Sequence, residues 1–193
     1  MQLVNERNVE RKERMKSRYK IVESDGVYFI TSTIVEWIPI FTNEDIFQII
    51  ADSLNYCIKE KELNIYSYVI MPNHLHLIAS AKDFSESMKS FKRYTAKEII
   101  QYFKKSKYEW VLNQLHFFKK RNKIESEYQV WQEGFHPQLI SSYKMLEQKI
   151  HYIHNNPVKK GFVNEPKCWK YSSANNKDFD VNEIIKLCSL DDL

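Results

Sequence analysis

One short stretch, MPNHLHLI at residues 71–78, constrains the fold of this chain more than any other. Side chains along a β-strand alternate between its two faces, so His74 and His76 would share one face while Leu75 and Leu77 share the other. The stretch therefore predicts a strand whose leucines anchor it in a core and whose two imidazoles can reach a single divalent metal. A His-x-His pair also arises often by chance, so a metal site needs further ligands and a suitable context.

A second segment, YIHNNPV, adds a phenol and an amide. We expect a helix that begins at Ser141 or Ser142 and ends before Pro157. Its buried stripe would consist of Leu146, Ile150 and Ile153. At about 100° per residue, Tyr152 and Asn156 are neighbours on one flank of this helix, away from that stripe. The core therefore does not need the tyrosine, and Asn156 could serve as the C-cap of the helix.

The remaining periodicity predicts an α+β chain. Strands are expected where β-branched and aromatic residues cluster, at residues 27–35, 65–70, 74–79 and 130–132. Helices are expected where apolar residues recur at helical spacing, at residues 43–61, 85–105 and 141–155. The second and third strands are so close in sequence that they should pair as a hairpin. Residues 111–118 are compatible with either a helix or a strand.

Length and composition favour a single domain. The chain has 193 residues, 43% hydrophobic and 14% aromatic, and only three glycines and five prolines, which argues against long linkers. Three scattered cysteines without C-x-x-C spacing fit reduced thiols better than a zinc cluster. No apolar run approaches the roughly 18 residues of a membrane helix, and the charged start is unlike a signal peptide. We therefore expect a cytoplasmic protein without a membrane partner.

Together the two segments resemble a known family. The His-hydrophobe-His motif, followed far downstream by the tyrosine helix, is similar to the REP-associated tyrosine transposases, within the HUH single-tyrosine (insertion sequence 200-like) transposase superfamily. The landmarks occur in the family's order over residues 28–174: YFITSTIV, YSYVIMPNHLHLIAS, MKSFKRYTAKEII, VWQEGFHP, YIHNNPVKKGFV and WKYSSA. An acidic tail after Ala174 and a long loop at residues 119–127 depart from compact members. These departures leave the DNA sequence preference open, and also whether the protein is a monomer or a homodimer.

The resemblance implies a fold and a chemistry. The fold would be one antiparallel sheet with helices on one face, ferredoxin-like and close to RNA-recognition modules. Tyr152 would attack a phosphodiester of single-stranded DNA, giving a 5′-phosphotyrosine adduct and a free 3′-hydroxyl. His74, His76 and Asn156 would bind a metal, for which Mg²⁺ or Mn²⁺ suits an amide oxygen. The substrate would be a strand with a hairpin formed by an extragenic palindrome, and the protein would be associated with the nucleoid.

Basic residues suggest how DNA would be bound. The net charge of +4 is modest, but the basic residues are clustered among aromatic ones, as on surfaces that bind phosphates and stack unpaired bases. We divide the chain into a basic arm (1–22), a catalytic domain (23–175) and a tail (176–193). The candidates for DNA binding are Arg14, Lys16, Arg18, Lys92, Arg93, Lys159 and Lys160.

Two other functions remain open. The chain could be a non-catalytic single-stranded nucleic-acid-binding protein of the same fold, or a metal-dependent phosphodiesterase without a covalent step. The presence of both histidines together with Tyr152 favours the transposase. Tyr94 and Tyr143 are the competing phenols, and we expect them to stack on bases or pack in the core instead.

Overall fold

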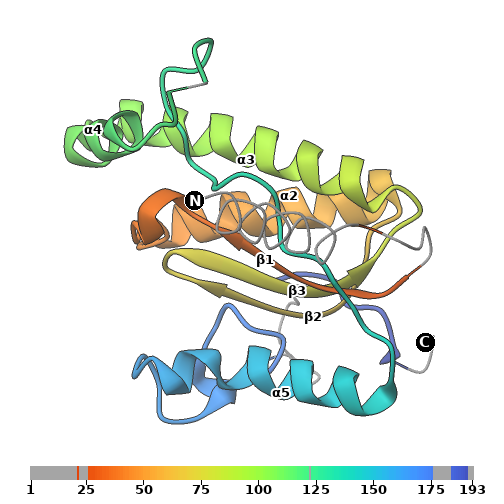
Figure 1. The fold of residues 1–193 in the computed structure, drawn as a ribbon. Helices are drawn as coiled ribbons and strands as arrows, with labels where there is room; N and C mark the ends of the chain where they lie inside the picture. The colour runs from red at the N-terminus through yellow and green to blue at the C-terminus, as the bar shows by residue number, and fades with distance from the viewer. Residues whose placement is uncertain (1–20, 22–25, 122, 176–183, 191–193) are drawn as a thin grey trace, which may run out of the picture.

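A four-stranded antiparallel sheet lies between two layers of helices (Figure 1). The computed structural model describes residues 21, 26–121, 123–175 and 184–190. Within these residues the strand order is β2-β3-β1-β4. The strands are β1 (Tyr28–Thr33), β2 (Asn64–Met71), β3 (His74–Ser80) and β4 (Gln138–Leu139). The histidine strand β3 is therefore paired on both edges, with β2 on one side and β1 on the other.

The expected hairpin forms between β2 and β3. Pro72 and Asn73 make a two-residue turn, and Met71 pairs with His74 across it. Proline fits this turn because it has no N–H to contribute to a strand ladder. The alternation in β3 places Leu75 and Leu77 in the larger core cluster, as the sequence predicts.

The larger core lies between the sheet and three helices. They are α2 (Glu44–Lys61), α3 (Phe84–Lys105) and α4 (Glu109–Phe117). The side chain of Asn43 caps α2 by accepting a hydrogen bond from the Ile46 N–H at 3.1 Å. The side chain of Asp83 caps α3 in the same way, accepting from the Glu86 N–H. The segment that was compatible with helix or strand is thus largely the helix α4.

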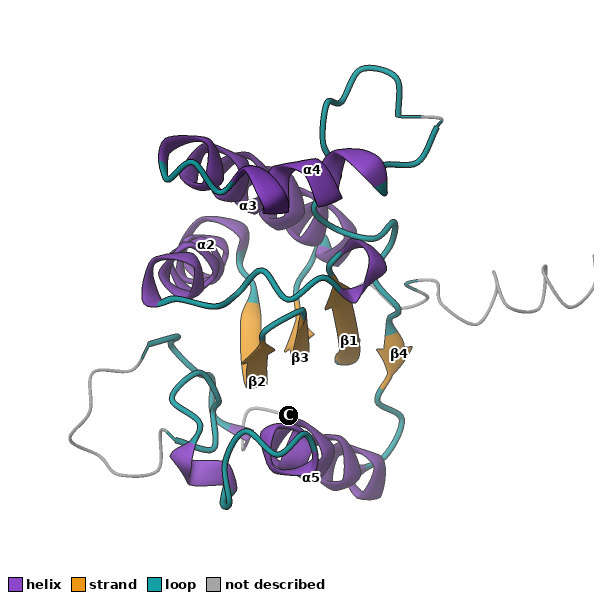
Figure 2. Cartoon of the chain, turned by 90° about the vertical axis from the view of Figure 1, so that its left-hand side faces the viewer, coloured by secondary structure: helices purple, strands orange, loops and turns teal. Residues whose placement is uncertain are grey.

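Helix α5 (Tyr143–Lys159) covers the opposite face of the sheet (Figure 2). Leu146 and Ile153 of this helix form a second, smaller core with residues of three strands. The strand residues are Phe29, Tyr66, Val69, Met71 and Ile78. The α+β class and the antiparallel sheet are confirmed, but the prediction that helices cover only one face of the sheet is wrong. The sheet is apolar on both faces, so both must be covered.

Three local expectations differ from the structure. Helix α5 continues through Pro157 to Lys159, because a proline in the last turn removes only one helical hydrogen bond. Residues 130–132 form no regular strand; Trp131 makes a single bridge to Ile34. The two-residue strand β4 was not expected, since two residues are too few to show a period.

The described residues include no helix long and apolar enough to cross a membrane. All three cysteines are free, with Cys57 buried and Cys168 exposed. The expected basic arm lies outside the described residues except for Ile21, as does most of the expected tail.

Candidate active site between strand β3 and helix α5

The two histidines lie on the face of β3 that is covered by α5. His74 and His76 are each only 4% exposed, and their ring centroids are 4.7 Å apart. Both side chains project between the sheet and the helix because alternation directs them away from the leucine face. The strand therefore holds two imidazoles together in a nearly dry environment.

A hydrogen bond occupies the Nδ1 atom of each histidine ring. The Asn73 side chain donates its Nδ2–H to the Trp37 carbonyl at 3.0 Å, so its Oδ1 must face His74. That oxygen can only accept, and it lies 2.7 Å from His74 Nδ1, which therefore carries the proton. The Nδ1 of His76 lies 2.8 Å from the Thr31 hydroxyl oxygen. Each Nε2 remains for another partner, the pattern found where a protein group orients a metal-binding histidine.

Both rings are neutral at physiological pH. Burial lowers the pKa of His74 to about 4, and the positive charge of Lys160 adds to the effect. Burial likewise lowers the pKa of His76 to about 3, with His74 and Lys149 acting in the same direction. A neutral imidazole is the form that binds metals.

Tyr152 lies directly beside this pair. Its ring centroid is 5.2 Å from that of His76, in an edge-to-face arrangement, and 5.9 Å from that of Phe29. Tyr152 is 40% exposed, so one side of its phenol faces solvent while the other side packs against the rings of His76 and Phe29. The ammonium of Lys159 lies 5.8 Å from the centre of the phenol ring.

Asn156 lies one helical turn after Tyr152 and is 5% exposed. It is inside the helix, whose C-cap is Lys160, so the reading of Asn156 as the C-cap is wrong. Among the described residues, neither Asn156 Oδ1 nor His76 Nε2 has a hydrogen-bond partner, although both atoms are buried. Leaving a buried polar atom unsatisfied is costly, so each of these atoms is suited to bind a ligand.

The donor set fits a divalent metal. Two imidazole nitrogens and one amide oxygen are ligands that Mn²⁺ accepts, and the oxygen also suits Mg²⁺. The described part of the chain contains no cluster of three or more His, Cys, Asp or Glu side chains that could bind a metal. Within those residues, Asn156 offers a third ligand of another kind, its side-chain carbonyl oxygen.

The candidates for DNA binding are divided between two regions. Lys160 is close enough to His74, and Lys159 to Tyr152, to interact electrostatically with the site. Arg93 lies on α3, on the other side of the sheet, and pairs with Glu86 at 3.4 Å. Three further candidates, Arg14, Lys16 and Arg18, lie outside the described residues.

Lys92 has a structural role. Its ammonium donates to the backbone carbonyls of Gln132, at 2.6 Å, and Gly134, and lies over the ring of Trp131. Burial lowers the pKa of Lys92 to about 8, and Lys123 contributes to the shift. We therefore leave Lys92 out of the proposed DNA surface, because two of its three N–H donors are bonded to backbone carbonyls.

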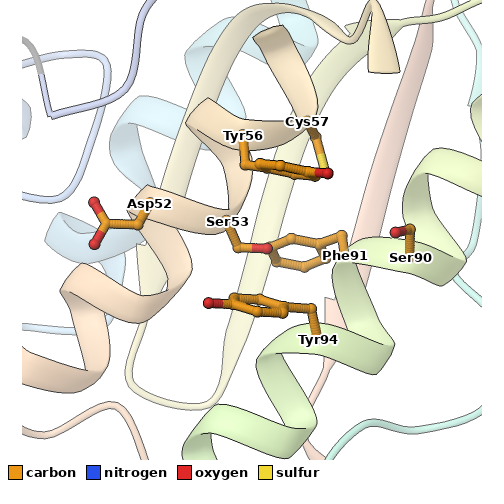
Figure 3. A pocket seen from close by; sticks show the side chains of 7 residues that line it. All are labelled: Asp52, Ser53, Tyr56, Cys57, Ser90, Phe91 and Tyr94. Carbon is orange, nitrogen blue, oxygen red and sulfur yellow. The ribbon is translucent and has the colours of Figure 1, made fainter. Parts of the chain in front are cut away.

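The competing tyrosines lie away from the histidines. Tyr94 lies on α3 and lines a pocket of about 480 Å³ with Tyr56 of α2, and the ring of Phe91 appears between the two tyrosines in Figure 3. This pocket is on the other side of the sheet from His74 and His76. Tyr143 is at the start of α5, nine residues before Tyr152 and so about 13 Å away along the helix.

Comparison with known proteins identifies the family of the chain. The model of a family described as "Transposase IS200 like" matches residues 14–156, which is most of the chain. The chain belongs to the IS200-like transposase family. A Haemophilus influenzae protein named "Putative REP-associated tyrosine transposase" is 31% identical over 104 residues. That match spans 54% of each protein, or about half the length of the relative.

A solved structure also resembles this member of the IS200-like family. It is that of a REP-associated tyrosine transposase bound to a REP hairpin, with a TM-score of 0.63 and 18% identity. The superposition covers 88% of this chain and 90% of the other. At this identity the likeness establishes the shared fold.

Sequence reasoning missed three residues that shape the site of this family member. Thr31 and Asn73 orient the histidine rings, and Lys149 of α5 lies with its ammonium 4.5 Å from the ring of Phe29. Asn73 was visible beside the motif, but only its two hydrogen bonds show what it does. Thr31 and Lys149 are brought to the histidines by strand pairing and helix packing, which no local pattern reveals.

Proposed function

We propose that this protein cleaves and rejoins single-stranded DNA through a covalent link to Tyr152. The observation that supports this most is the edge-to-face packing of the Tyr152 ring on His76. One turn further along α5, the buried Asn156 oxygen has no hydrogen-bond partner among the described residues. A nucleophile, two metal-binding nitrogens and an oxygen ligand are thus contributed by two elements that pack together. Neither a structural tyrosine nor a structural asparagine requires this arrangement.

The proposed reaction is a transesterification. The phenol oxygen of Tyr152 forms a bond to the scissile phosphorus, and the bond from phosphorus to the 3′-oxygen breaks. The proton lost by the phenol is balanced by one gained at the released 3′-hydroxyl. The 5′-phosphotyrosine link keeps the energy of the phosphodiester, so a 3′-hydroxyl can later reverse the step and rejoin DNA without ATP.

The surrounding residues would assist by charge and position. A divalent cation held by His74, His76 and Asn156 would polarise the phosphate and neutralise charge as it develops. The ammonium groups of Lys149 and Lys160 are near enough to the histidines to attract the same phosphate. Because Tyr152 is partly exposed, a strand can approach the phenol from the solvent side.

The proposed substrate is a single strand that carries a hairpin. The solved structure of the same fold holds a transposase bound to a REP hairpin, and Tyr152 of this chain is 40% exposed, which supports a strand reaching the phenol. We propose the same class of DNA for this chain, bound by a monomer or a homodimer. A non-catalytic binder would use the same surface but would never form the adduct.

The decisive experiment replaces Tyr152 with phenylalanine. Tyr152→Phe removes only the hydroxyl, so folding and hairpin binding should survive, while cleavage and the denaturant-resistant protein–DNA adduct should both fall below detection. Tyr94→Phe is the matched control and should keep both activities, because Tyr94 lies across the sheet. Cleavage that persists in Tyr152→Phe would indicate a hydrolase, and a wild-type protein that binds without forming an adduct would indicate a binder.

The metal is tested by chelation. Cleavage should require Mg²⁺ or Mn²⁺ and stop with a chelator, and His76→Ala should behave like metal removal. Undiminished cleavage by His76→Ala in excess chelator would overturn the metal assignment.

A further inference from the structure

The turn after β1 presents an exposed tryptophan beside the histidine pair. Ile34, Val35 and Ile38 are buried in the larger core, so the chain is anchored on both sides of this turn. Between these anchors Glu36 and Trp37 are exposed, Trp37 to 53%. An indole is among the side chains that gain most from burial, so its exposure at this position requires an explanation.

The backbone of the turn is held in an unfavourable conformation. Glu36 has φ 48° and Trp37 has φ 58°, a left-handed region that residues with a Cβ rarely adopt. A turn whose only task was to reverse the chain would be formed at lower cost by glycine. Strained residues persist where their surroundings hold them, and they cluster at ligand sites.

Asn73 couples this turn to the candidate active site. The same amide side chain donates to the Trp37 carbonyl and accepts from the His74 ring, at 3.0 and 2.7 Å. The ring centroids of Trp37 and His74 are 5.5 Å apart, with an interplanar angle of 70°. The indole therefore has a fixed position relative to the imidazole that would bind the metal.

We propose that Trp37 is a stacking platform for an unpaired base of the DNA strand, next to the phosphate at the histidine site. This inference rests on the proposed function and names one contact of its substrate. A base is covalently close to its own phosphate, so an aromatic ring in contact with His74 is within reach of a strand held there. Stacking on an aromatic face tolerates any base, because every base has a π-face, and it needs no hydrogen-bond partner.

The test compares two exposed tryptophans on two DNA probes. The probes are a hairpin with short oligothymidine flanks and the same hairpin with abasic flanks, which has equal charge but no flanking bases. Binding is measured by fluorescence anisotropy without divalent metal, so that cleavage does not interfere. Trp37→Ala should bind the thymidine probe about 5- to 100-fold more weakly than wild type, and the abasic probe equally well. Trp37→Phe, which keeps an aromatic face, should recover part of the loss.

Trp110→Ala is the matched control. Trp110 is 63% exposed but lies on α4, which packs on α3 rather than on the sheet. The Trp110→Ala variant should bind both probes as tightly as wild type. Equal loss in both alanine variants, or no loss in Trp37→Ala, would overturn the platform. If Trp37→Ala shows no loss but the wild-type protein still forms the covalent adduct, the proposed function stands and only the platform is overturned. A wild-type protein that binds neither probe would overturn both.

Discussion

At the scale of single residues, the orientation of His76 depends on a neighbour that is not itself a ligand. Thr31 Oγ1 lies 2.8 Å from Nδ1 of His76 and holds the ring with Nε2 turned away from the strand partner. We expect Thr31→Val, which removes the hydroxyl but keeps the shape, to weaken metal binding by about 10- to 100-fold. Titration of Mn²⁺ followed by calorimetry measures the change.

Thr31→Ser is the control for this prediction. It keeps the hydroxyl and removes a methyl group, so its affinity for Mn²⁺ should stay within a few-fold of the wild type. Equal affinities of Thr31→Val and Thr31→Ser would show that the hydrogen bond does not position the imidazole for metal.

The residues of the site were predictable to different degrees. His74, His76, Tyr152 and Asn156 could be named because two local patterns match a family motif. The structure brings the rings of the first three together, and Asn156 lies one turn after Tyr152 on α5. Their roles remain proposals. Lys92 was predicted to bind DNA, but the sequence did not show that it donates to two backbone carbonyls of a loop about forty residues away. Sequence shows which side chains are charged, but not which charges the fold has already used.

At the scale of elements, the start of α5 sets the position of the helix that carries Tyr152. The sequence left Ser141 and Ser142 as alternative caps, and the structure has the Ser142 side chain accept from the Met145 N–H at 3.3 Å. We expect Ser142→Ala to lower the free energy of unfolding by about 1 kcal/mol, because one backbone donor of the first turn loses its partner. Urea denaturation measures this.

Ser141→Ala supplies the comparison, since Ser141 is adjacent and exposed but does not cap the helix. Its stability should equal that of the wild type within about 0.5 kcal/mol. A loss in Ser141→Ala as large as in Ser142→Ala would contradict the assignment of the cap.

Elements whose periodic pattern extends over many residues were predictable, and shorter elements were not. Helices α2 and α3 and the hairpin of β2 and β3 agree with the expectation to within a few residues. Strand β4 is too short to carry a pattern. The end of α5 was mispredicted at Pro157, because the number of helical hydrogen bonds that a proline disrupts depends on its position in the helix. The face covered by α5 was not predictable either, since buried residues such as Phe29 and Ile78 alternate with other buried residues.

At the scale of the whole molecule, we expect DNA binding to weaken as salt rises, and to depend on the α5 side of the protein. Each phosphate neutralised on a single strand contributes about 0.7 to the slope of log affinity against log salt. Lys160→Ala should reduce that slope by about this amount, because Lys160 is near His74. Anisotropy titrations of a flanked hairpin at several salt concentrations measure the slope.

Lys59→Ala should leave the slope unchanged. Lys59 is exposed but lies on α2, on the opposite side of the sheet from α5. A reduction in slope as large as that for Lys160→Ala would mean that DNA is not confined to the face with the histidines.

The central place of β3 has a consequence for how the protein would lose its activity. Strands β1 and β2 hydrogen-bond to both edges of β3 along its length, so the histidines belong to the part of the molecule that opens last. Helix α5 is held by the smaller core and can come away while the sheet and its larger core stay intact. Under stress the chain would therefore keep both imidazoles in place and lose its nucleophile first. Inactivation would precede unfolding, and it would be reversed when α5 packs again.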